Sequence, residues 1–207
     1  MDAHGFKGGG YLYFDDENKR YAGLLELEFS GIVTLKAIGL LTTRMPDGSD
    51  GFSLLILITA EFAPIQLGFG FTLLGVGGLF GLNRTMKLDV LRKGIKENSL
   101  ASVLFPKNII ENADRIISDL RQIFPPQQDR FVFGPMAKIG WGTPTLLGIE
   151  LGLIIEVPNP VTVAILGIFR AILPDERAAI IKIQVNFLGS IEFVKQLISF
   201  DAGLYDS

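Results

Sequence analysis

A strict alternation of apolar and polar residues most constrains what this chain can fold into. Residues 178–193, AAIIKIQVNFLGSIEF, show it most cleanly, because Ile181, Ile183 and Val185 stand at odd-numbered positions while Lys182, Gln184 and Asn186 stand at even-numbered positions. A period of two is typical of a β-strand with one apolar face and one polar face. The chain is therefore expected to build an antiparallel sheet whose apolar face something must cover.

The same alternation runs through residues 21–43, where Leu25, Leu27 and Phe29 share one parity. This segment exceeds a usual strand, so either Gly31 marks a break or the strands here are unusually long. Further strands are predicted where β-branched and aromatic residues gather between turn signals rich in proline, glycine and aspartate. These predicted strands cover residues 10–14, 52–62, 130–136, 145–157, 161–169 and 197–204.

The middle of the chain changes to a helical period. Residues 107–124, KNIIENADRIISDLRQIF, place their isoleucines, Leu120 and Phe124 on one helical face. Asn108 is the expected N-cap, and two prolines end the segment. A weaker helical pattern covers residues 86–99. We expect these helices to cover part of the apolar sheet face or to cap one end of the sheet.

These patterns predict an α+β fold that is mostly β, with a two-helix insertion at about residues 86–124. The long, curved antiparallel sheet would form an open groove, a sandwich or a barrel. The 207 residues are expected to form a single domain within a longer protein. Its parts are a β half at 1–82, a helical insert at 83–128 and a second β half at 129–207.

Composition excludes several classes of function. The net charge of -3 gives no basic surface for nucleic acid. The absence of cysteine excludes disulfides, thiolate nucleophiles and cysteine-ligated metals. His4 is the only histidine, so it has no partners for a catalytic triad or a histidine-based metal site. The sequence therefore predicts no catalytic residues, no metal ligands and no cofactor, and we expect a protein that is not an enzyme.

The glycine-rich stretch at residues 67–84, LGFGFTLLGVGGLFGLNR, allows three interpretations. A dinucleotide-binding loop that starts at Gly75 would need a glycine where Phe80 stands, so this interpretation fails. A membrane-spanning helix has the required length and low polarity but lies between segments that have strand patterns. A strand followed by an architectural bend from Gly75 to Gly81 fits best. Gly68 and Gly70 would leave one face of that strand without side chains.

Two pairs of carboxylates are formal candidates for acid–base chemistry. Glu26 and Glu28 share one strand face, and Glu150 and Glu156 lie in a later predicted strand. Solvated strand residues are the default interpretation of both pairs. The DGSDG segment at 47–51 is expected to be a hairpin turn rather than a calcium loop, because the ligand series of such a loop is missing.

Several long sequence segments resemble those of an uncharacterised bacterial family of large β-rich proteins, which is defined only by a domain of unknown function. These segments lie at residues 68–84, 99–125, 130–146 and 200–207. The resemblance implies no activity and no functional residues. In architecture alone, strands followed by a helical segment and then more strands are similar to the bridge-like lipid-transfer proteins. In those proteins an apolar sheet face contacts acyl chains.

The leading hypothesis is a non-enzymatic module that binds an apolar ligand such as lipid in a groove or cavity. The residues predicted to line it are Leu25, Leu27, Phe29, Phe69, Phe71, Ile181, Ile183 and Val185. One alternative is a structural or assembly domain with a closed core, whose sheet edges pair with adjacent domains of a longer chain. A further alternative is a membrane-inserting segment at residues 52–82. Nucleic acid is not an expected partner.

Overall fold

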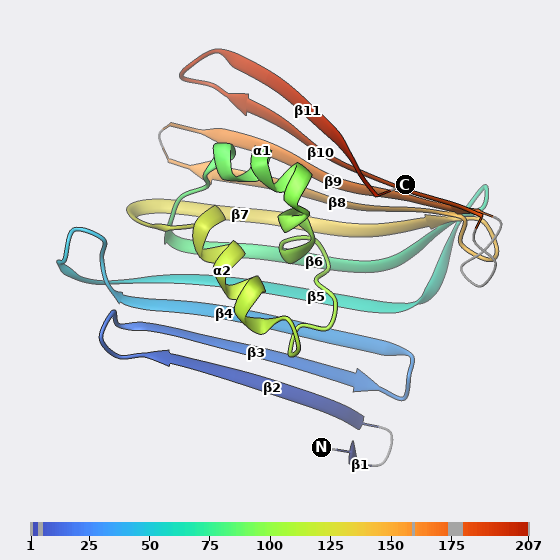
Figure 1. Cartoon of the computed structure of the whole chain (residues 1–207), viewed down its shortest axis with the longest axis horizontal. Helices are drawn as coiled ribbons and strands as arrows, with labels where there is room; N and C mark the ends of the chain where they lie inside the picture. The colour runs from blue at the N-terminus through green and yellow to red at the C-terminus, as the bar shows by residue number, and fades with distance from the viewer. Residues whose placement is uncertain (1, 4–5, 159, 174–179, 207) are drawn as a thin grey trace.

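The computed structural model describes residues 2–3, 6–158, 160–173 and 180–206. Within these residues, eleven strands pair in chain order into one antiparallel sheet, with β1 at one edge and β11 at the other (Figure 1). Each inner strand therefore lies between the strands that precede and follow it in the sequence. The prediction of a mostly β fold with an antiparallel sheet and a helical insertion is confirmed.

The sheet has six strands before the helical insert and five after it. The first group comprises β1 (Asp2–Ala3), β2 (Phe6–Asp15), β3 (Arg20–Phe29), β4 (Val33–Arg44), β5 (Asp50–Gly68) and β6 (Phe71–Arg84). The second comprises β7 (Pro126–Trp141), β8 (Leu147–Val157), β9 (Thr162–Leu173), β10 (Ile181–Glu192) and β11 (Leu197–Asp206). Of the two alternatives for residues 21–43, the structure has the break, because the turn between β3 and β4 contains Gly31 with a φ of 68°.

The insert between β6 and β7 contains α1 (Leu88–Glu97), a 3₁₀ turn (Ser99–Ser102) and α2 (Ala113–Ile123). It lies across one face of the sheet, which we call the insert face (Figure 1). Helix α1 packs against β10 and β11. Helix α2 extends on the same face toward the other edge of the sheet, where Asp114 accepts a hydrogen bond from Tyr11 of β2. The insert thus ties together strands that are far apart in the meander.

Both helices are shorter than their sequence patterns predicted. Helix α2 begins at Ala113, and Asn108, the expected N-cap, lies five residues earlier in a left-handed backbone conformation with a φ of 47°. The side chain of Asn112 donates to the carbonyl of Asn108 and caps no amide. Helix α1 begins at Leu88 without a side-chain cap, and the hydroxyl of Thr85, which precedes the predicted helix, donates to Glu156.

The insert does not cover the apolar parity of the strands, contrary to the expectation. Ile38 and Leu40, which interrupt the polar parity of β4, lie beneath the insert, as do Leu55 and Leu57 of β5. On the side of the strands that carries most of their polar residues, leucine and isoleucine at the centre of the sheet form a core with the amphipathic helices. The strictly apolar parity is left on the opposite side, which we call the open face.

The glycine-rich stretch is a hairpin and not a bend. Its start forms the β5–β6 turn, where Gly68, Phe69 and Gly70 all have positive φ, so these glycines serve the turn and do not thin a strand face. Strand β6 then runs through Gly75 and Gly81, which contradicts the predicted bend. Among the described residues, no helix is long and apolar enough to cross a membrane.

Candidate functional site

The open face is the most distinctive surface of the molecule. It is built from alternate residues of β2 to β11, which register into rows that cross the whole sheet. One row comprises Leu12, Gly23, Gly39, Ile56, Phe80, Phe133, Ile155, Val163, Ile191 and Ile198. A parallel row comprises Gly8, Leu27, Leu35, Ala60, Val76, Ala137, Leu151, Gly167, Phe187 and Ala202. Neither row contains a polar side chain.

The open face is large for an exposed apolar surface. Ten strands about 4.8 Å apart, paired over roughly ten residues each, give it an area on the order of 1,400 Å². The largest apolar patch on a typical monomer covers about 300–600 Å². Central side chains remain accessible here, since Ile58, Phe80 and Ile165 are each 45–48% exposed. The described part of the chain leaves this face uncovered.

Shallow apolar depressions mark the open face where glycines stand among large side chains. One, of about 630 Å³, is lined by Leu12, Leu25 and Ile56 around Gly23 and Gly39. A second, of about 590 Å³, lies farther along the sheet beside Gly78. Its lining includes Ile58, Val76, Phe80, Phe133 and Pro135. A third, of about 270 Å³, is lined by Phe71, Ile139, Trp141, Leu147, Ile149 and Phe169, with adjoining glycines.

The predicted ligand-lining residues lie on or beside the open face. Leu25, Leu27 and Phe29 belong to β3, Phe71 to β6, and Ile181, Ile183 and Val185 to β10. Phe69 lies in the β5–β6 turn and is 97% exposed. They do not converge on one cavity, because β3 and β10 are seven strand spacings apart, or about 33 Å. Their role in ligand binding stays a prediction.

The insert face carries the charges that the open face lacks. A row of ionic contacts crosses it from β4 to β9. Lys36 donates to Glu61 at 2.9 Å, and Lys138 also binds Glu61. Lys138 lies 3.9 Å from Glu150, which in turn accepts a hydrogen bond from Arg170 at 2.7 Å. Glycine at position 75, which pairs with both Glu61 and Lys138, leaves room for these two side chains to meet across β6.

The two carboxylates of this row have opposite pKa shifts. Burial raises the pKa of Glu150, and attraction to Arg170 and Lys138 offsets this only in part. Burial also acts to raise the pKa of Glu61, but hydrogen bonds from Lys138 and Lys36 outweigh it, so the net pKa is lowered. One oxygen of Glu150, Oε2, is buried without a hydrogen-bond partner. The negative charge of Glu61 is thus better compensated by the neighbouring cations than that of Glu150.

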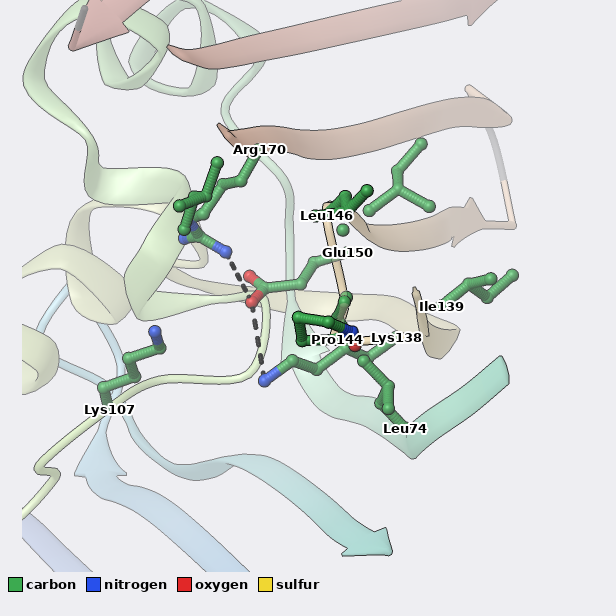
Figure 2. A pocket seen from close by; sticks show the side chains of 12 residues that line it. Leu74, Lys107, Lys138, Ile139, Pro144, Leu146, Glu150 and Arg170 are labelled. Atoms are coloured by element: carbon green, nitrogen blue, oxygen red, sulfur yellow. Dashed lines mark hydrogen bonds and ion pairs between the residues drawn. The ribbon is translucent and has the colours of Figure 1, made fainter. Parts of the chain in front are cut away.

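A pocket of about 640 Å³ opens beside Glu150 on the insert face (Figure 2). Lys138, Glu150 and Arg170 come from neighbouring strands of the sheet, and Lys107 comes from the loop before α2. Apolar walls are supplied by Leu74, Pro144, Leu146 and Ile172, and the residues of the β7–β8 turn close one side. We call this the charged pocket. The sequence analysis missed it, because its charges lie far apart in the sequence and meet only through strand register.

Glu150 and Glu156 are not solvated strand residues, as their default interpretation held. Both are 2% exposed on the insert face. Glu156 accepts hydrogen bonds from Arg130, from the Thr85 hydroxyl and from the amide of Met86. The two carboxylates are six residues apart along β8, or about 20 Å, too far for paired glycosidase chemistry, which needs about 5–9.5 Å.

The DGSDG segment has a structural role as a turn. Asp47 accepts hydrogen bonds from the amide and hydroxyl of Ser49 within the β4–β5 turn, as the hairpin interpretation of this segment predicted. No group of three or more acidic, histidine or cysteine side chains that could hold a metal occurs in the described ranges. His4 lies outside the residues that the structure describes.

Fold and surface together define a β-rich module in which one meandering sheet carries a helical insert on one face and an uncovered apolar surface on the other. The chain belongs to a family of unknown function, DUF6603, whose model matches residues 1–207. This confirms the resemblance to a family defined by a domain of unknown function. Comparisons with curated proteins and with solved structures found no significant match.

Proposed function

We propose that this module binds lipid and that acyl chains lie along its open face. The observation that carries the proposal is the composition of that face from β2 to β11. The two rows of registered residues that cross the whole sheet contain no charged side chain. The few polar atoms of the open face belong to aromatic side chains such as Tyr21 and Trp141, which already donate to Asp16 and to the Phe69 carbonyl. An acyl chain, which forms no hydrogen bonds, matches such a surface.

The same composition favours lipid over a protein partner. Protein interfaces form about one hydrogen bond per 100–200 Å² of buried area and have a polar rim. A face on the order of 1,400 Å² would then contribute roughly ten such bonds, and its side chains offer almost no groups to form them. The shallow depressions beside Gly23, Gly39 and Gly78 provide space in which methylene groups can pack between large side chains.

Lipid content of the purified full chain tests the proposal directly. The protein would be expressed in a host with ordinary phospholipids, purified without detergent, and analysed by native mass spectrometry and by lipid extraction. We expect co-purified lipid above the background of a control protein handled in the same way. Absence of lipid combined with twice the monomer mass would overturn the proposal and assign the open face to a second copy of the chain.

Paired variants on β10 locate the binding to one face. Ile183 is 37% exposed on the open face, and its neighbour Lys182 points to the insert face. We expect Ile183→Lys to weaken binding of a fluorescent fatty acid by about tenfold, or about 1.4 kcal/mol, because an ammonium group would stand among acyl chains. Lys182→Gln should leave the affinity unchanged. Ile58→Lys, at the centre of the face, repeats the test on another strand. Equal effects of Ile183→Lys and Lys182→Gln would contradict binding at this face.

A second function, assembly with further β structure, is favoured by the edge of the sheet. Strand β11 has no further strand beside it among the described residues. Its sequence, LISFDAGLYD, has none of the proline or lysine residues that usually protect an edge strand from pairing. Sedimentation of the isolated chain tests this function. A concentration-dependent series of oligomers that Phe200→Pro abolishes would support edge pairing, and a monomer at all concentrations would argue against it.

A further inference from the structure

We propose that the charged pocket on the insert face is a second binding site, specific for a small organic anion with an apolar body. The anionic group would be a carboxylate or a phosphate. This site lies on the opposite side of the sheet from the open face and does not depend on lipid binding there. It rests on four features of the pocket, namely an unmatched positive charge, free donors, apolar walls and a fixed loop.

The first feature is the balance of charge. Lys107, Lys138 and Arg170 line the pocket together with a single carboxylate, Glu150 (Figure 2). Beyond the pocket, Glu61 binds both Lys138 and Lys36, so the wider group has four cations and two carboxylates. A partly enclosed cavity with this excess of positive charge attracts an anion, because the charges are screened less there than at an open surface.

The second feature is the supply of hydrogen-bond donors. An ammonium group has three donors. Lys138 uses one on Glu61, and its separation of 3.9 Å from Glu150 is too long for a hydrogen bond. Within the described part of the chain, the ammonium group of Lys107 forms no hydrogen bond or ion pair and interacts with Glu150 only at longer range. Several donors therefore remain for the oxygens of a ligand, with Lys107 and Lys138 on adjacent walls.

The third feature is the remainder of the pocket wall. Leu74, Pro144, Leu146 and Ile172 add apolar surface to the same pocket. The volume of about 640 Å³ lies within the range of about 300–1,000 Å³ found for small-molecule sites. An inorganic anion would leave these walls unused, whereas an anion with an attached hydrocarbon body would contact both the charges and the walls.

The fourth feature is the segment that positions Lys107. This residue follows buried Pro106 and lies between two residues with left-handed backbones, Phe105 (φ 44°) and Asn108 (φ 47°). Such conformations cost on the order of 1–3 kcal/mol each and persist where the surrounding structure imposes them. Phe105 is fully buried, and the Lys138 ammonium lies 6.0 Å from its ring centre. One buried side chain thus fixes the loop that carries Lys107 and also contacts the second lysine of the pocket.

Calorimetric titration of the full chain tests the site with four probes below their micellar concentrations. Octyl phosphate and octanoate carry the two candidate anions on one body, octyl glucoside carries the body without charge, and inorganic phosphate carries charge without the body. We expect binding of at least one of the two octyl anions, and the tighter one identifies the anionic group. Octyl glucoside binding as tight as the octyl anions would overturn the anion site. Inorganic phosphate binding as tight as octyl phosphate would overturn the proposed ligand class.

Two charge-reversal variants in the insert distinguish binding in the charged pocket from a general effect of net charge. Lys107→Glu should weaken binding of the octyl anions by about 10- to 100-fold, the loss expected for a charged hydrogen bond. Lys93→Glu, on the exposed side of α1, makes the same change in net charge outside the pocket and should have no comparable effect. Both lysines are exposed, so both variants should fold. Equal effects of the two variants, or no binding by the wild-type chain at millimolar concentrations, would refute the proposal.

Discussion

The ring of Phe105 in the helical insert lies directly over Gly75 of β6. A Cβ atom at position 75 would stand 3.0 Å from Cε1 of Phe105 and 2.8 Å from the carbonyl oxygen of Ala60. The carbonyl belongs to the neighbouring strand and cannot turn away. We therefore predict that Gly75→Ala lowers the free energy of unfolding by about 1–3 kcal/mol, the usual cost of overpacking. Urea denaturation followed by circular dichroism measures this change.

Gly39→Ala is the matched control for this prediction. Gly39 lies in the middle of β4, and a Cβ atom there would meet nothing within 4 Å. Its substitution by alanine should change the free energy of unfolding by less than about 0.5 kcal/mol. A similar loss in both variants would mean that glycine matters here for backbone reasons and not for the seating of Phe105.

The ion pair between Arg130 and Glu156 leads to a second prediction. Both side chains are largely buried, at 14% and 3% exposed, and Glu156 also receives hydrogen bonds from the segment that begins the insert. Arg130→Met would leave a buried carboxylate without its cation, so we expect a loss of about 3–5 kcal/mol in the free energy of unfolding. The double variant with Glu156→Gln should recover part of this loss. Identical stabilities of the single and double variants would contradict this account.

The sequence predicted the fold better than it predicted which face of the sheet is covered. Alternation located the strands, and the period change located the insert, because both depend on local spacing. The choice of covered face depends on the sum of many strands. Ile38 and Leu40 look like exceptions within β4, yet together with Leu55 and Leu57 they form the floor beneath the insert. Only register shows that these residues are neighbours.

The charged pocket was beyond sequence reasoning for the same reason. Glu150 stands among the polar positions of the predicted strand 145–157, where a solvated residue is the default, and Lys138 and Arg170 lie just beyond the ends of the predicted strands 130–136 and 161–169. Their proximity follows from pairing between β7, β8 and β9, and Lys107 joins them only because the loop before α2 folds back over the sheet. A useful signal was the presence of opposite charges at matching positions of consecutive hairpin strands, which indicates cross-strand pairs.

Glu61 and Glu150 should give the pH dependence of stability opposite signs. The folded-state pKa of Glu150 is raised above its ordinary 4.5, so the folded protein keeps a proton that the unfolded chain releases, and the free energy of unfolding falls as pH rises through this window. The folded-state pKa of Glu61 is lowered, so its stabilising contribution is present above pH 4.5 and is lost as pH falls through the lowered pKa.

Two glutamine variants separate these contributions. Relative to the wild type, Glu150→Gln should gain stability as pH rises from 4.5 through the raised pKa of Glu150, because glutamine cannot ionise. Glu61→Gln should lose stability relative to the wild type as pH rises through the lowered pKa of Glu61 to 4.5. Chemical denaturation at several pH values measures both differences. If the free energy of unfolding of both variants changes with pH in the same direction relative to the wild type, the opposite pKa shifts of Glu61 and Glu150 would be contradicted.

Trp141 provides an optical test of the open face, because it is the only tryptophan in the chain. Its ring is 40% exposed and lines the apolar depression with Phe71 and Phe169. A lipid chain that covers this depression would remove water from the indole, so we predict that monoolein shifts the fluorescence emission to shorter wavelength. Phe71→Ser should reduce the shift, and Lys107→Glu, on the other face, should preserve it. Unchanged emission at a monoolein concentration where bound lipid is recovered by extraction would place the lipid away from this end of the open face.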